Sequence, residues 1–168
     1  MIPIILLVVF TIVIIFVSFM KKNKEINETL SIGTEYGVQV NDKQLYTFTI
    51  NNISKVQTYS DCEIVIIDFT YKNNNIEDNF IINQKNFDVV DDSNQQIEYI
   101  DCSLIHNKPR IIKKNQTYSA QLAYSIHKNT KELFLKFHTQ YTNDTALFQL
   151  PAQHIPRMLL QNNFRYAV

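Results

Sequence analysis

Strict alternation of apolar and polar side chains is the feature that most constrains the fold of this chain. It is clearest in "QLYTFTIN", residues 44–51, where Tyr46, Phe48 and Ile50 share one face and two threonines take the other. Successive side chains of a β-strand point to opposite faces, so this period of two predicts a strand with one buried face. The segment is therefore expected to lie in a sheet that covers a hydrophobic core.

Further segments show strand patterns separated by turn-forming residues. Residues 62–73, "CEIVIIDFTYKN", are apolar on both faces through positions 64–67, which is typical of a central strand in a sandwich. In residues 86–101, "DDSN" predicts a turn between two short strands, and hence a hairpin. More strands are expected at residues 114–129, 132–140 and 146–150. About seven short strands predict an all-β sandwich.

Composition and length narrow the possible functions. The chain has 168 residues, which suits one domain and an appendage. Sixteen basic residues balance sixteen acidic ones, so the surplus of positive charge that nucleic-acid binding needs is missing. With Gly33 and Gly37 as the only glycines, the sequence has no glycine-rich phosphate loop, and no nucleophile-elbow motif occurs. We expect no nucleic-acid partner, no enzyme activity, no cofactor and no small-molecule substrate.

A long apolar run precedes the strands. Residues 2–20, "IPIILLVVFTIVIIFVSFM", contain nineteen positions without a charge. As a helix they extend about 28 Å, close to the roughly 30 Å of a bilayer's hydrocarbon core. The run lacks the basic start and small-x-small cleavage site of a signal peptide, and no cysteine follows it for lipid attachment. We predict one uncleaved transmembrane helix in contact with membrane lipid, in preference to a cleaved signal peptide or a buried helix.

The order of the strands and several of their residues resemble a known family. The likeness is carried by "CEIVIIDFTYKNNN", then "FDVVDDSNQQIEY", then "IIKKNQTYSAQLAYSIHKNTKELFLKF". These segments resemble the telokin-like, immunoglobulin-like domain of unknown function found on Gram-positive lipoproteins and membrane-anchored proteins. The matching positions are Phe87, Asp91 and Tyr99 in its middle motif and Leu122, Tyr124 and Ile126 in its last.

The resemblance covers about residues 30–150, although "KKNQ" at 113–116 stands where the family has Pro-Gly. It implies an extracytoplasmic, immunoglobulin-like β-sandwich with a binding or scaffolding role and no established catalytic residues. The expected organisation is therefore an anchor at residues 1–20, a polar stalk at 21–30, the sandwich at 31–150 and a tail at 151–168. That tail suits either a short amphipathic helix or a frayed terminus.

The side of the membrane is contested by two observations. Lys21, Lys22 and Lys24 directly follow the apolar run, and by the positive-inside rule they determine a topology with the domain in the cytoplasm. The family resemblance implies the opposite side. We expect a single-pass protein of the cell membrane with an extracytoplasmic domain, and the cytoplasmic alternative stays open.

The predicted function is a non-catalytic protein-binding module at the cell envelope. Its tether would raise the effective concentration of the domain near an envelope or membrane protein partner. One alternative is an accessory or structural subunit of a larger membrane complex. A less favoured one is a hydrolase with an unrecognised site.

The side chains able to carry special chemistry have simpler interpretations. Cys62 and Cys102 are the only cysteines. Outside the cytoplasm a disulfide between them would stabilise the domain by about 3 to 4 kcal/mol, and the alternative is two separate half-buried thiols. Four histidines lack the spacing of zinc ligands, and an acidic cluster lacks the spacing and glycine of a calcium loop. These are His106, His127, His138 and His154, and Asp88, Asp91 and Asp92 with Asn94. We therefore predict no metal site, and a turn stabilised by its own Asp and Asn side chains.

Overall fold

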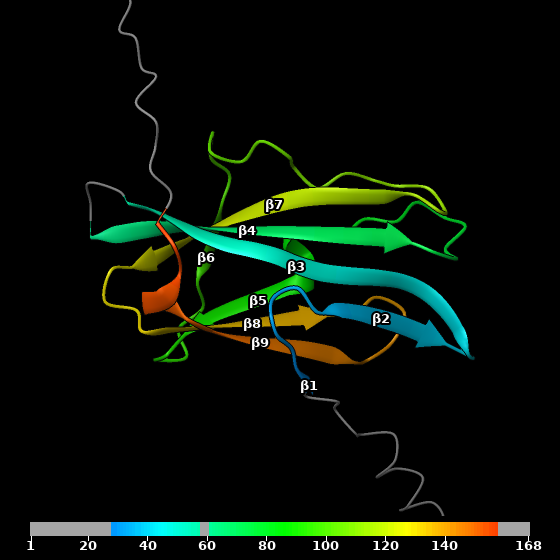
Figure 1. The fold of residues 1–168 in the computed structure, drawn as a ribbon, viewed down its shortest axis with the longest axis horizontal. Coiled ribbons are helices and arrows are strands. Elements are labelled where there is room, and N and C mark those ends of the chain that lie inside the picture. Colours follow the sequence, from blue (N-terminus) through cyan, green and yellow to red (C-terminus); the bar gives the residue numbers. More distant parts are fainter. Residues whose placement is uncertain (1–27, 58–60, 158–168) are drawn as a thin grey trace, which may run out of the picture.

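The computed structural model describes residues 28–57 and 61–157, which form two β-sheets packed into a sandwich (Figure 1). Within these ranges there is no α-helix, and only two short 3-10 helices occur, η1 (Gln84–Asn86) and η2 (Ala152–His154). The predicted all-β sandwich is confirmed. It has nine strands, because short strands at 28–29 and 35–40 add to the seven or so expected from the alternation.

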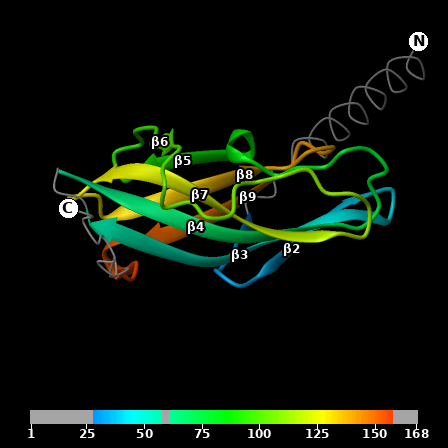
Figure 2. The same ribbon diagram turned by 90° about the horizontal axis from the view of Figure 1, so that it is seen from above.

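One sheet has five strands and the other has four. The first runs in the order β2 (Glu35–Val40), β3 (Lys43–Gln57), β4 (Cys62–Asn73), β7 (Thr117–His127) and β6 (Glu98–Ile100). The second runs in the order β1 (Glu28–Thr29), β9 (Thr145–Pro151), β8 (Glu132–His138) and β5 (Phe87–Asp91). Every neighbouring pair is antiparallel except β1 and β9, which are parallel. Strands β3 and β4 extend along most of the length of the domain (Figure 2).

The core between the sheets is aromatic. Tyr46, Phe48 and Ile50 are fully buried, as the alternation predicts. The Phe48 ring stacks on Phe137 with centroids 4.4 Å apart. It also lies within 6.2 Å of three further rings, those of Phe69, Phe87 and Phe148. Since these rings come from both sheets, Phe48 joins the two layers at their centre.

Strand β4 is central, as its continuous apolar run predicts. Ile67 faces the core between the sheets, while its neighbour Ile66 faces a second, smaller cluster on the outer side of the sheet. That cluster is covered by the segment after β6, where Ile105 is 7% exposed. Both faces of β4 are therefore buried, which explains why alternation is lost there.

The predicted hairpin at residues 86–101 is wrong in its pairing, although its turn is present. The Asp91 carboxylate accepts hydrogen bonds from the backbone N–H groups of Ser93 and Gln95, and Asn94 has a φ of 61°. The two strands then part: β5 pairs with β8 in one sheet, and β6 pairs with β7 in the other. The turn thus crosses between the layers, because Phe87 and Val89 are buried against the four-stranded sheet.

Several predictions fall on residues that the structure does not describe. These are the helix at 1–20, the topology-determining Lys21, Lys22 and Lys24, and most of the tail at 151–168. Across 28–57 and 61–157, no helix has the length and apolar character needed to cross a bilayer. The end of the predicted stalk at 21–30 is described: it contributes β1 to the sheet, and Leu30 is 9% exposed.

Candidate functional site

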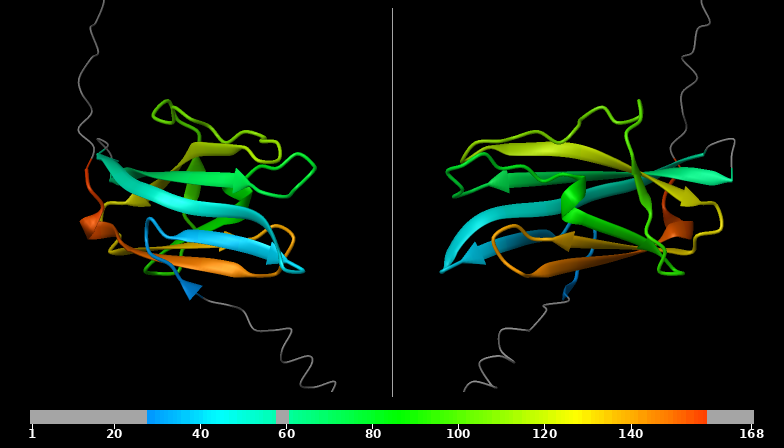
Figure 3. Two further views of the ribbon diagram at one scale, coloured as in Figure 1. Left: turned by 45° about the vertical axis from the view of Figure 1, so that its right-hand side comes forward. Right: turned by 180° about the vertical axis from the view of Figure 1, so that it is seen from behind.

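A cavity of about 600 Å³ opens at one end of the sandwich. It lies where β3 ends and β4 begins, beside the β7–β8 turn and η2. Both views of Figure 3 show η2 at this end of the domain. Four cationic side chains line the cavity with a single carboxylate. We call this set, Lys55, Glu63, Lys128, Lys131 and Arg157, the basic pocket.

The floor of the basic pocket is a buried ion pair between adjacent strands. The Lys55 ammonium donates to Glu63 Oε2 at 3.0 Å, and the two side chains are only 7% and 3% exposed. Lys55 lies opposite Val65 and Glu63 lies opposite Gln57, so the two are diagonal neighbours on β3 and β4. Residues in this relation are within reach of long side chains. Removing one charge from such a pair would leave the other buried without compensation.

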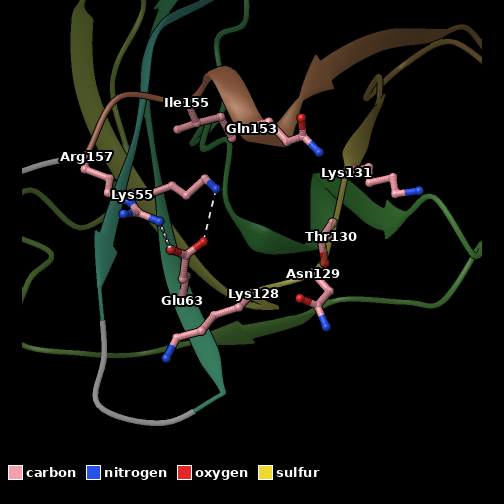
Figure 4. Close-up of a pocket in the computed structure, with 9 residues that line it drawn as sticks. All are labelled: Lys55, Glu63, Lys128, Asn129, Thr130, Lys131, Gln153, Ile155 and Arg157. Atoms are coloured by element: carbon pink, nitrogen blue, oxygen red, sulfur yellow. Dashed lines mark hydrogen bonds and ion pairs between the residues drawn. The ribbon is translucent and has the colours of Figure 1, made fainter.

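The end of the described chain supplies a second cation to Glu63. Arg157 Nη2 donates to Glu63 Oε1 at 3.2 Å, yet the arginine side chain remains 64% exposed. Its position is set by backbone pairing, because the Lys55 N–H donates to the Pro156 carbonyl at 2.8 Å. Figure 4 shows Lys55 and Arg157 converging on the Glu63 carboxylate. The carboxylate is thereby occupied on both oxygens.

Two further cations come from the turn between β7 and β8. Lys128 and Lys131 are exposed, and neither has an ion-pair partner within residues 28–57 and 61–157. The turn that carries them is anchored by its backbone: Lys128 N–H donates to the Asp61 carbonyl and Lys131 N–H to Asp92 Oδ1. Their ammonium groups extend in different directions from this turn (Figure 4). They form an uncompensated positive charge at the mouth of the cavity.

The remaining lining is mostly polar. Asn129 and Gln153 present exposed amides, and Thr130 is buried at 7% exposure between the two lysines. Ile155, at 9% exposure, is the apolar contact. Cations combined with amide donors and acceptors suit an anionic ligand that also carries polar groups, because charge-assisted hydrogen bonds are the strong ones and amides fix orientation.

A smaller cleft of about 230 Å³ lies next to the basic pocket and shares Thr130 with it. Asp91, Cys62 and His127 line this cleft. The hydrogen bond from Ser93 lowers the pKa of Asp91, and the backbone of the turn and the nearby His127 act in the same direction. Within the described ranges, no three His, Cys, Asp or Glu side chains are arranged to hold a metal ion.

The two cysteines predicted to pair are kept apart by the sheet register. Both are half-buried thiols in the structure. Cys62 is opposite His127 on β7, whereas Ile100 is opposite Ala123, four residues or about 13 Å along the same strand. Cys102 lies further along in the same direction. Because a disulfide needs Cα atoms within about 7 Å, this register argues against the predicted bridge.

The histidines and the acidic cluster take separate places. His127 lies at the end of β7, whereas His138 on β8 contacts Asp88 through Nε2 at 2.6 Å. Asp91 caps its own turn, and Asp92 Oδ1 accepts from the backbone of Lys131. The structure thus shows the turn that was predicted from the acidic residues, and one of them also helps to position the basic pocket.

The basic pocket itself was missed by sequence reasoning. Arg157 and Glu63 are 94 positions apart, so no local pattern joins them. The available signal was weaker: Lys55 and Glu63 are opposite charges near the facing ends of two strongly predicted strands. An antiparallel connection would have brought those two charges together.

Comparison with known proteins identifies related folds and no family. No family model matches the chain, and no curated protein matches it. Among solved structures, a candidate lipoprotein of Bacillus subtilis, ycdA, matches with a TM-score of 0.55 and 13% identity, over 74% of this chain and 40% of its own. The yjhA protein of the same organism gives 0.52 and 18% identity, over 71% and 97%. An uncharacterized β-sandwich protein of Clostridium difficile gives 0.50 and 14%, over 76% and 97%.

At these identities the likeness shows the fold alone. The chain spans well under half the length of ycdA and nearly the whole of the other two proteins. The comparisons therefore support a β-sandwich module similar to uncharacterized bacterial proteins.

Proposed function

We propose that this chain is a non-catalytic binding module of the cell envelope, which engages an anionic group of another envelope component at the basic pocket. The observation that carries the proposal is the excess of cations around a cavity of about 600 Å³. A protein whose overall formal charge is zero has concentrated positive charge at one end. Such local charge attracts and orients an anionic partner.

The chemistry of the pocket favours binding over catalysis. A general base must be able to accept a proton from a substrate, but both oxygens of Glu63 already accept hydrogen bonds from Lys55 and Arg157. The other charged groups of the lining are cations with elevated ordinary pKa values, which suit recognition of a negative charge.

The apolar run of residues 2–20 supplies the tether in this proposal. A single transmembrane helix would hold the sandwich close to the bilayer and raise its effective concentration near membrane partners. The resemblance to telokin-like, immunoglobulin-like domains, and the fold shared with the candidate lipoprotein ycdA, support an extracytoplasmic position. Lys21, Lys22 and Lys24 favour the cytoplasmic alternative.

Photo-crosslinking in living cells tests the binding role. A photoreactive amino acid replaces Asn129 in the pocket lining, and a matched control carries it at Asn143, an exposed residue of the β8–β9 turn. We expect adducts from position 129 that disappear with Lys128→Glu and Lys131→Glu, and none of these adducts from position 143. Adducts that are equal at both positions, or that survive both charge reversals, would contradict the proposal.

A single cysteine tests the location. Asn143→Cys in a Cys62→Ser, Cys102→Ser background places one exposed thiol on the domain. We expect a membrane-impermeant maleimide to label it in intact cells, and the labelled chain to sediment with membranes. Protection until the cells are lysed would place the domain in the cytoplasm.

A further inference from the structure

The basic pocket contains one compensated pair and three cations that remain available. Lys55 and Glu63 neutralise one another in the floor, where both are at least nine-tenths buried. Arg157 uses one of its five N–H donors on Glu63 and is otherwise exposed, while Lys128 and Lys131 have no ion-pair partner in the part of the chain that the structure describes. A ligand in the cavity therefore meets a surplus positive charge that Glu63 has only partly offset.

The arrangement of these cations favours a phosphate over a carboxylate. Lys128 and Lys131 extend from one turn in different directions, and Arg157 comes from a separate segment (Figure 4). A planar carboxylate carries one charge and is best matched by a single bidentate arginine. A phosphate carries a charge of about −1.5 to −2 and presents three acceptor oxygens in a tetrahedral arrangement, so it satisfies donors that approach from several directions.

The cavity is larger than one phosphate needs. Pockets of roughly 300–1,000 Å³ hold small organic ligands, and this one measures about 600 Å³. Asn129 and Gln153 add amide groups to the lining, which can both donate to and accept from hydroxyl groups. The lining thus fits a phosphate joined to a polar, hydroxyl-bearing body.

We infer that the basic pocket binds a phosphate ester with a hydroxyl-bearing body, its phosphate held by Lys128, Lys131 and Arg157 and its body by Asn129 and Gln153. This inference rests on the proposed binding function and names the chemical class of the ligand. The phosphate belongs either to a free small molecule or to a lipid headgroup.

Three ligands with the same sugar ring isolate the contribution of the phosphate. The full chain, purified in a neutral detergent, is titrated calorimetrically with glucose 6-phosphate, glucuronate and glucose. We expect glucose 6-phosphate to bind at least about tenfold more tightly than glucuronate, because the phosphate carries more charge and one more acceptor. Glucose should show no binding. Equal affinity for glucuronate, or no binding by glucose 6-phosphate, would overturn the inference.

Matched lysine variants assign the binding to the pocket. Lys128→Gln with Lys131→Gln should weaken glucose 6-phosphate at least about tenfold. The control, Lys43→Gln with Lys85→Gln, removes the same charge from exposed positions at the other end of the sandwich and should leave the affinity unchanged. Both lysines of the pocket are exposed, so the melting temperature of each double variant should match the parent chain. Equal weakening by both double variants would contradict a specific site.

The source of the phosphate is resolved by a change of environment. The titration is repeated with the full chain in nanodiscs of neutral phosphatidylcholine and of anionic phosphatidylglycerol. Both outcomes support phosphate recognition: weaker glucose 6-phosphate binding only in the anionic discs identifies a competing lipid headgroup, and equal binding identifies a free ligand. If no phosphate compound binds while crosslinks from position 129 still require the lysines, the phosphate assignment fails and the binding function stands.

Discussion

The aromatic core and the floor of the basic pocket are two buried regions on the same strands, and they are held together by different forces. Phe48 and Lys55 both lie on β3, at 0% and 6% exposure. Phe48 is surrounded by four other rings from both sheets, and its burial is favoured because apolar surface leaves water. Lys55 meets one carboxylate, and the attraction between them is offset by the cost of removing both charges from water.

The comparison separates what stabilises this domain from what equips it. Burying a phenylalanine stabilises a fold by roughly 1.5–3 kcal/mol, whereas a buried ion pair often contributes no more than an apolar pair of the same volume. The core is therefore expected to determine stability. The Lys55–Glu63 pair is expected to be retained for the pocket that it shapes.

The largest effect should follow truncation at the centre of the core. Phe48→Ala is expected to reduce the free energy of unfolding by about 3–5 kcal/mol, since it removes a ring and leaves a cavity between the sheets. Urea denaturation followed by circular dichroism measures the loss. Phe134→Ala, on the half-buried outer face of β8, is the control and should cost less than half as much. A similar cost at both positions would mean that Phe48 does not join the layers as described.

A smaller effect should follow the loss of one charge from the pocket floor. Glu63→Gln leaves the Lys55 ammonium buried without a carboxylate, so we expect the free energy of unfolding to fall by about 3 kcal/mol. The double change Lys55→Met with Glu63→Leu replaces both charges by apolar groups and should bring stability back to within about 1 kcal/mol of the parent chain. If the double variant is as unstable as Glu63→Gln, the pair itself is a net source of stability and the contrast with the core is wrong.

The smallest effect concerns the turn next to the pocket and depends on pH. Hydrogen bonding by Ser93 lowers the pKa of Asp91 below its ordinary value of 3.8. A depressed folded-state pKa gives stability that is present above the unfolded pKa and is lost as pH falls through the folded pKa. Asp91→Asn should therefore cost up to about 1 kcal/mol at pH 7.

The difference between Asp91→Asn and the parent chain should shrink as the pH falls below about 4. Urea denaturation at a series of pH values from 7 to 3 measures it. A gap that stays constant across this range would show that the charge of Asp91 does not contribute.

Much of the sheet structure could be predicted locally, and the pairing of strands could not. The alternation in residues 44–51 places Tyr46, Phe48 and Ile50 in the core without any knowledge of their partners. The turn at 91–94 was also predictable, because Asp and Asn side chains bond to their own backbone. The assignment of β5 and β6 to different sheets was not, because it depends on β8 and β7, which follow later in the chain.

By itself the sequence determined the all-β class, the inward face of the main strands and the turn at Asp91, because each depends on side chains only a few residues apart. Only the tertiary structure decided which layer each strand joins and that Lys55, Glu63 and Arg157 meet. Those contacts join positions as much as 94 residues apart. Their energy comes from packing and charge across the sandwich, which no local period in the sequence records.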